Sequence, residues 1–184
     1  MAAPQRRWAA ELLHVWFHKF GPKVWFAPDS RADELLRRRF ARELTRLAAR
    51  PAGEFLDDPL TALASVLLFD QLPRNLFRKD PRTYAFDPLA REIAKGALAR
   101  GWDRALTPVQ RQFLAMPLMH SEAIADQRYC LEVYNELGPR FGRPFAVSHH
   151  RMIARFGRFP HRNEVLGRAT TAAEKRAVAA GYHW

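Results

Sequence analysis

The segment DDPLTALASVLLFDQLPRN, residues 57–75, decides the fold class. Asp58 stands directly before Pro59, a pair typical of a helix start, because the carboxylate caps backbone N–H groups and proline fits the first turn. The residues that follow are almost all apolar as far as Phe69. Since a helix that is apolar on every side must be buried, the segment predicts a central helix with other elements packed around it.

Similar start and stop signals recur along the chain. Asp87 and Pro88 open another predicted helix, which Gly101 closes. The segments TPVQ (107–110) and TTAAE (170–174) have the spacing of capping boxes. No run of alternating β-branched residues lies between these segments, so we expect no strands. The sequence therefore predicts an all-α fold of about seven to nine helices packed as antiparallel helical hairpins.

The N-terminal third follows the same pattern. Apolar residues at helical spacing predict a helix over 5–20, and Gly21 supplies a stop. The segment KVWFAPDS (23–30) is predicted to be an extended linker. Ser30 is the expected N-cap of a further helix near 31–50, whose apolar face includes Phe40.

Composition limits the partners and the location. The 184 residues, 48% of them hydrophobic, are enough for one core, so we expect a single all-helical domain over residues 1–184. The formal charge of +11 would suit an acidic partner, but the arginines are scattered from Arg6 to Arg176 and form no block. Cys130 is the only cysteine, and no segment has the pattern of a signal peptide or a membrane span. We expect a cytoplasmic protein that has no membrane partner.

The first of three polar clusters is DQLPRN, which ends the apolar helix. Asp70 and Arg74 are four residues apart, as are Gln71 and Asn75, so a further helical turn would bring each pair together. Pro73 lacks an N–H group, which leaves carbonyl groups for side chains or a ligand to satisfy. A helix end tied by an Asp70–Arg74 ion pair explains the cluster equally well.

The second cluster is MHSEAIADQ. Pro117 ahead of it marks a helix break or start, and Ser121 would cap a helix that runs to Leu137. His120 and Glu122 are two residues apart and share no helical face, so they are not a helical metal-binding pair. Imidazole and carboxylate groups suit zinc, iron or nickel, and a metal site here would use His120, Glu122, His150 and His161. The signal is too weak for us to assign a metal, and the sequence identifies no cofactor.

The third cluster is HHRMIARFGRFPHRNEVLGR, residues 149–168. Met152 and Ile153 would face the core of a helix, which Gly157 and Pro160 end with a tight turn. Arginine and histidine side chains suit the binding of carboxylates or phosphates. They could also pair internally with the carboxylates of the first two clusters, at Asp70 and Glu122. The turn is expected to present Arg158, His161, Arg162 and Asn163.

These three motifs, in this order after an early VWF…VWF, closely resemble the bacterial family known as domain of unknown function 924, over Leu12 to Tyr182. The resemblance implies a tetratricopeptide-repeat-like helical fold and carries no established reaction. Phe69 and the FLAMPLMHSE segment depart from the usual pattern without changing its polar positions. The positions that match are Asp70, Gln71, Pro73, Arg74, Asn75, His120, Ser121, Glu122, Gln127 and the run from Arg155 to Asn163.

The leading hypothesis is a site in which the three motifs converge on a small anionic molecule. His120, Glu122 and His161 would orient it or transfer protons, which leaves open whether the protein is an enzyme. The binding residues would be Asp70, Gln71, Arg74, Asn75, Ser121, Gln127, Arg155, Arg158, Arg162 and Asn163.

Two other classes of function remain. In the first, the protein is a tetratricopeptide-repeat-like module that binds a protein partner, and the polar clusters are internal networks. Nucleic-acid binding through the arginine-rich faces is the least favoured, because the chain has no recognisable DNA- or RNA-binding motif.

Overall fold

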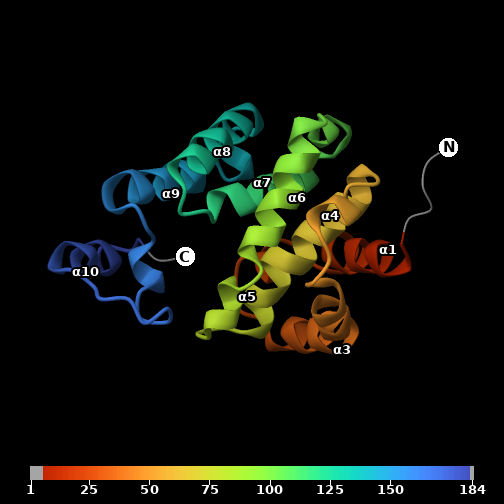
Figure 1. Ribbon diagram of the computed structural model, residues 1–184, viewed down its shortest axis with the longest axis horizontal. Helices are drawn as coiled ribbons and strands as arrows, with labels where there is room; N and C mark the ends of the chain where they lie inside the picture. The colour runs from red at the N-terminus through yellow and green to blue at the C-terminus, as the bar shows by residue number, and fades with distance from the viewer. Residues whose placement is uncertain (1–5, 183–184) are drawn as a thin grey trace. The chain divides into compact units, whose positions relative to one another are not determined.

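The computed structural model describes residues 6–182 of the chain (Figure 1). Within this part, helices are the only regular elements, and no strand occurs. Leaving aside the four-residue α2, residues 6–182 contain nine α-helices, so the predicted all-α class and number of helices are confirmed. None of the described helices is both long and apolar enough to cross a membrane.

The chain divides into two compact units. Unit 1 comprises Met1–Arg78 and Arg82–Pro117, and unit 2 comprises Lys79–Pro81 and Leu118–Trp184. The boundary falls inside one helix, α7 (Pro108–Met119). The single domain expected over residues 1–184 stays a prediction, and the two units are described separately.

The quoted apolar segment forms the centre of unit 1. It folds as α4 (Pro59–Val66), a π-helical turn (Leu67–Gln71) and α5 (Leu72–Leu76), and every residue from 61 to 73 is buried. The Asp58 carboxylate accepts hydrogen bonds from the N–H groups of Leu60 and Thr61, both at 2.9 Å. The predicted cap and the burial of this helix are therefore confirmed.

Other helices of unit 1 pack around this centre. Both α1 (Arg7–His14) and α6 (Asp87–Ala99) pack against α4, and α3 (Ser30–Leu47) packs against α5 (Figure 1). A π-helical turn (Val15–Lys19) continues α1. Short 3₁₀ turns of unit 1 lie at Ala52–Phe55, at Pro81–Tyr84, which begins in unit 2, and at Trp102–Ala105.

Three local predictions in this part of the sequence are wrong. Asp29, not Ser30, caps α3, because its carboxylate accepts the N–H of Ala32. The segment predicted as an extended linker contains most of α2 (Pro22–Trp25), where the Trp25 indole N–H donates to the carbonyl of Trp16. Pro117 neither breaks nor starts a helix; it lies in the last turn of α7, where its missing N–H group removes one hydrogen bond and the helix continues to Met119.

Unit 2 contains a helical hairpin followed by a turn and a short helix. The hairpin consists of α8 (Ile124–Leu137) and α9 (Arg143–Phe156), which pack together and are joined through a 3₁₀ turn (Pro139–Phe141). A second 3₁₀ turn (Pro160–Arg162) leads towards α10 (Ala172–Ala179), and the two contact each other. Buried Met152, Ile153, Phe159 and Ala177 form a hydrophobic cluster of this unit.

The predicted helix boundaries of unit 2 are partly confirmed. Gly157 ends α9 with φ 68°, a left-handed conformation that glycine adopts at little cost. The capping box of Thr171 and Glu174 at the start of α10 is present. Ser121 does not stand at the N-cap of α8, which is Ala123; its hydroxyl accepts the Ala123 N–H and donates to Asp126.

Candidate functional site

The first motif forms a buried ion-pair network in unit 1. The Arg74 guanidinium lies 3.3 Å from the fully buried Asp70 carboxylate and donates to the Asp70 carbonyl, so the predicted Asp70–Arg74 pair is confirmed. It also makes a bidentate contact with Asp87, at 2.8 and 3.0 Å. Burial alone would lower the pKa of Arg74, but the Asp70 and Asp87 carboxylates raise it overall.

The other polar residues of this motif find separate partners. Gln71 donates to the Asp70 carboxylate, whereas Asn75 donates to Asp33 at 2.8 Å. The predicted Gln71–Asn75 pair is therefore wrong, because each amide donates to a carboxylate oxygen instead. Asp87 does not cap α6 as its position before Pro88 suggested, since its carboxylate is turned to Arg74.

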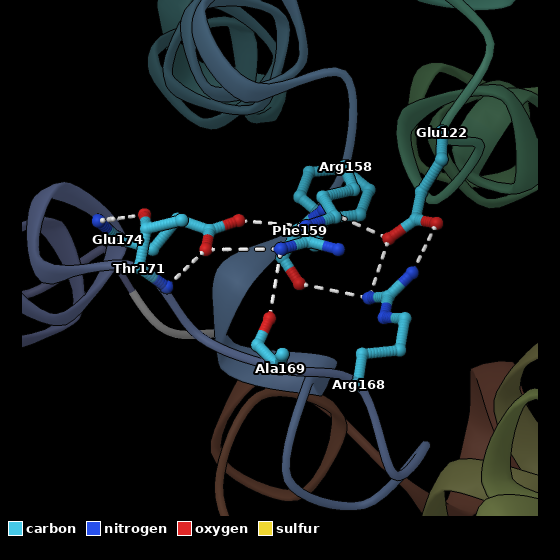
Figure 2. A network of polar contacts seen from close by, with 7 residues as sticks. All are labelled: Glu122, Arg158, Phe159, Arg168, Ala169, Thr171 and Glu174. Carbon is cyan, nitrogen blue, oxygen red and sulfur yellow. Dashed lines mark hydrogen bonds and ion pairs between the residues drawn. The ribbon is translucent and has the colours of Figure 1, made fainter.

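In unit 2, Glu122 is held by three hydrogen bonds (Figure 2). Arg168 donates to its two oxygens at 2.8 and 3.0 Å, and the Phe159 N–H donates at 2.7 Å. Burial acts to raise the pKa of Glu122, but these hydrogen bonds lower it overall. A carboxylate with a lowered pKa is a weak proton acceptor, so these contacts favour a structural role, and the proposed catalytic role stays a prediction.

Arg158 takes part in a second ion pair of the same network (Figure 2). It donates to Glu174 at 2.7 and 3.0 Å and to the carbonyl of Ala169 at 2.9 Å. The hydrogen bond from Arg158, followed by that from the Thr171 N–H, lowers the pKa of Glu174 to about 2. Arg158 therefore has an internal partner from α10.

Sequence reasoning missed both partners in this network. It offered Asp70 and Glu122 as internal partners of the arginines, but Glu174 pairs with Arg158, and Arg168 pairs with Glu122. Glu174 was recognised only as part of a capping box. The sequence did contain a signal for the Arg158–Glu174 pair. A capping-box carboxylate such as Glu174 accepts one backbone N–H and keeps lone pairs that can accept hydrogen bonds from an arginine.

Gln127 fixes the turn between α7 and α8. Its Nε2 donates to the carbonyls of Met119 and Ser121, both at 2.7 Å. Its Oε1 is buried and accepts no hydrogen bond from the described protein. The Nε2 group of Gln127 thus stabilises the turn, whereas its Oε1 atom has no structural role in these contacts.

The remaining motif residues gather around the buried ring of Phe159. The Arg162 guanidinium lies 4.5 Å from the ring centroid and donates to the His120 carbonyl at 3.0 Å. The imidazoles of His149 and His161 lie 5.4 and 5.7 Å from the same ring, centroid to centroid. His120 joins them, 6.3 Å from His149. We call His120, His149, Phe159, His161 and Arg162 the histidine centre.

His149 is the member that the sequence analysis did not select. It is 4% exposed, and its Nδ1 lies 2.8 Å from the carbonyl oxygen of Phe145, one helical turn earlier. Burial, followed by the electrostatic effect of His120 and then of Arg162 and His161, lowers the pKa of His149 to about 3. His149 is therefore neutral at physiological pH.

Asn163 follows the histidine centre in the chain and is fully buried. Both its amide nitrogen and its amide oxygen make no hydrogen bond with the described protein. Such an arrangement is rare, because an unsatisfied buried polar atom costs about 1–3 kcal/mol.

Two other predicted positions lie apart from this group. Arg155 is exposed on α9, with its guanidinium 4.9 Å from the Phe156 ring centroid. His150, the fourth residue of the metal set, has no ring contact with the histidine centre. Within residues 6–182, no three His, Cys, Asp or Glu residues are placed to hold a metal ion.

Comparisons with known proteins agree with the sequence motifs. A family model described as bacterial protein of unknown function (DUF924) matches residues 12–181. The chain belongs to this family. A solved structure of a protein of unknown function from Agrobacterium tumefaciens is 38% identical, with a TM-score of 0.88, over 94% of this chain and 97% of that one. No curated protein matches the chain.

The chemistry open to this family member differs between its two units. In unit 1 the motif side chains satisfy carboxylates and carbonyls of the protein itself. In unit 2 an arginine and two imidazoles lie against one aromatic ring, with a third imidazole next to one of them, and the nearby Glu122 carboxylate is already bound by Arg168. Groups of this kind suit an acceptor that carries negative charge.

Proposed function

We propose that unit 2 binds a small molecule with an anionic group at the histidine centre. Arg162 provides a permanent positive charge that is only 6% exposed, and the imidazoles provide donors that adapt to the ligand. We also propose that the protein is cytoplasmic and binds this molecule there. The proposal assigns no reaction, because the Glu122 carboxylate is already bound by Arg168.

The observation that carries the proposal is Asn163. Its two amide atoms are buried and have no hydrogen-bond partner in the described protein, while Gln127 Oε1 adds a third such atom. An apolar residue of similar size would avoid this cost, so keeping an asparagine is best explained by a molecule that it binds. Water is the competing occupant, since buried waters commonly satisfy such groups.

Thermal unfolding of the full chain in sodium sulfate tests the proposal, with sodium chloride of equal ionic strength as the reference. We expect sulfate at ten times its Kd to stabilise the protein by about 1.4 kcal/mol. Arg162→Gln retains a donor for the His120 carbonyl but removes the charge, so it should lose this stabilisation. Arg151→Ala, an exposed arginine of α9, is the matched control and should keep it.

Asn163→Leu separates a functional from a structural asparagine. If Asn163 serves a ligand, the variant without ligand should be as stable as the parent or more so, because unsatisfied polar atoms are removed. It should also bind sulfate more weakly. A less stable variant with unchanged sulfate stabilisation would show that Asn163 binds structural water and would contradict the proposal.

A second candidate function is a protein-interaction module whose polar motifs are structural. The internal networks of Arg74 and Arg158 favour it, because both side chains already have carboxylate partners. The tetratricopeptide-repeat-like architecture and a protein partner stay predictions. Nothing favours the nucleic-acid hypothesis, since several arginines of α3 are paired with Glu11, Glu34 and Glu43.

A further inference from the structure

Two exposed histidines, His14 and His18, lie next to each other in unit 1. His14 is the last residue of α1, and His18 belongs to the π-helical turn that continues this helix. Their imidazole centroids are 5.5 Å apart, with 25° between the ring planes. The segment HVWFH therefore places two metal-binding side chains side by side, in a different unit from the histidine centre.

The core of unit 1 holds the backbone between these two histidines. Val15 and Trp16 are buried, and the Phe20 N–H donates to the Val15 carbonyl at 3.0 Å, which closes the π-helical turn. The Phe17 ring packs against the buried ring of Phe113, with centroids 5.7 Å apart. Because the backbone is already ordered, only the two imidazole side chains need to be immobilised when they bind an ion together.

Both imidazoles are accessible to an ion from solvent. Within residues 6–182, each ring has the other as its neighbour rather than a carboxylate. An ion on this surface needs no cavity. Glu11 precedes His14 by three residues, but its carboxylate is paired with Arg39, so the ligand set consists of the two imidazoles.

The distance between the rings fits one shared metal ion. Two imidazoles whose nitrogens each lie about 2 Å from one tetrahedral zinc ion have ring centroids about 5 Å apart. The 5.5 Å between His14 and His18 is close to this value. The χ2 torsion of histidine is soft, so exposed rings can turn until one nitrogen of each faces the ion. Imidazole suits zinc, copper and nickel, whereas calcium and magnesium prefer oxygen ligands.

We propose that His14 and His18 form a surface site for one divalent transition-metal ion, such as zinc, nickel or copper. The two imidazoles occupy two of the four positions of a tetrahedral ion, and water or a donor atom of a second molecule takes the others. Binding involves no electron transfer. The ion joins two successive turns, so it stabilises the folded chain relative to the unfolded chain. The site is independent of the proposed function, which concerns unit 2.

Isothermal titration of the full chain, without an affinity tag, with zinc chloride at pH 7.5 tests the inference. Protons compete with metals for imidazole nitrogens, so a more acidic buffer would weaken binding. We expect one zinc ion per chain at this site. Zinc should also raise the melting temperature, whereas magnesium should leave it unchanged.

His14→Gln and His18→Gln should each weaken zinc binding by at least about tenfold, since the loss of an outer-shell partner alone costs this much. Both variants should unfold like the parent without metal, because the substituted side chains are exposed. His150→Gln is the matched control. It removes a histidine of unit 2 and should keep the affinity of the parent.

Nitrogen-15 spectra of the imidazoles identify the ligands directly. The signals of His14 and His18 should shift together as zinc is added, and those of His150 should stay in place. No zinc binding, or binding that either His14→Gln or His18→Gln retains with the affinity of the parent, overturns the inference. The sulfate experiment on unit 2 is unaffected by these outcomes, so the two proposals are tested separately.

Discussion

Arg74 in unit 1 and Arg162 in unit 2 both lie in a short helical segment within a polar motif, but their surroundings differ. Arg74 lies between two carboxylates, at 3.3 Å from Asp70 and 2.8 Å from Asp87. Arg162 lies over an aromatic ring, donates to a backbone carbonyl and has imidazoles as neighbours. The first arginine contacts two carboxylates directly, whereas the printed contacts of the second are with an aromatic ring and a backbone carbonyl.

This difference shows that motif residues of one family pattern can have unlike purposes. A buried arginine with two carboxylates stabilises the packing of the helices that supply them, and removing it leaves excess negative charge. In the proposed function, the arginine beside the imidazoles supplies a positive charge to an anionic ligand. Substitutions should therefore separate the two regions, since stability depends on the first and ligand affinity on the second.

The largest loss of stability is expected for Arg74→Ala. The variant removes the cation next to Asp70, whose side chain is fully buried, and breaking a buried ion pair costs about 3–5 kcal/mol. Chemical denaturation at pH 7 measures the change. Arg38→Ala is the control, because this arginine is 70% exposed and contacts Glu34 at 3.8 Å, so its loss should cost less than about 1 kcal/mol. Equal losses for the two variants would contradict the assignment of Arg74 to a structural network.

An intermediate effect is expected for His149→Phe in acid. The pKa of His149 is lowered from 6.5 to about 3 by folding, so the unfolded chain binds more protons between these values. The free energy of unfolding therefore falls as the pH falls below about 6.5. The neutral His149 accounts for a loss of about 2 kcal/mol at pH 5 relative to pH 7.

His149→Phe removes that contribution, so the stability curves of variant and parent should converge or cross as the pH is lowered from 7 to 5. Urea denaturation at each pH measures it, and His150→Phe should leave the slope of the parent unchanged. Parallel curves for His149→Phe and the parent would mean that the buried ring is not neutral in the fold.

The smallest effect is expected for Arg158→Ala. The Glu174 side chain is 3% exposed, but the Arg158 side chain that covers it is 31% exposed, so truncating Arg158 should let water reach the carboxylate, and the loss of melting temperature should be smaller than for Arg74→Ala. Because folding lowers the pKa of Glu174 from 4.5 to about 2, the ion pair stabilises the fold above pH 4.5 and loses its effect as the pH falls towards 2. A loss equal to that of Arg74→Ala at pH 7 would show that this turn is as buried as the centre of unit 1.

Local chemistry allowed much of the fold to be predicted. The cap at Asp58, the apolar run behind it and the capping box at Thr171 each depend on residues within a few positions of one another, so their spacing is enough to indicate a helix. The errors at Ser30 and Pro117 are also local, because neighbouring residues offer similar caps and the loss of one hydrogen bond at a proline does not always end a helix.

The candidate site could be predicted only in part. The sequence identified His120, His161 and Arg162 as chemically suited residues, but it could not reveal that Arg158 meets Glu174 or that Glu122 meets Arg168, since these pairs span 16 and 46 residues. It also passed over His149, whose importance comes from burial next to Phe159.

The sequence by itself determined the all-α class, the family and the set of residues with ionisable chemistry, because these follow from periodicity, capping and the order of short motifs. The tertiary structure decided which of those residues are neutralised by the protein. That depends on distances between segments far apart in the chain and on burial, which sets the pKa of His149 and leaves the Asn163 amide without a protein partner.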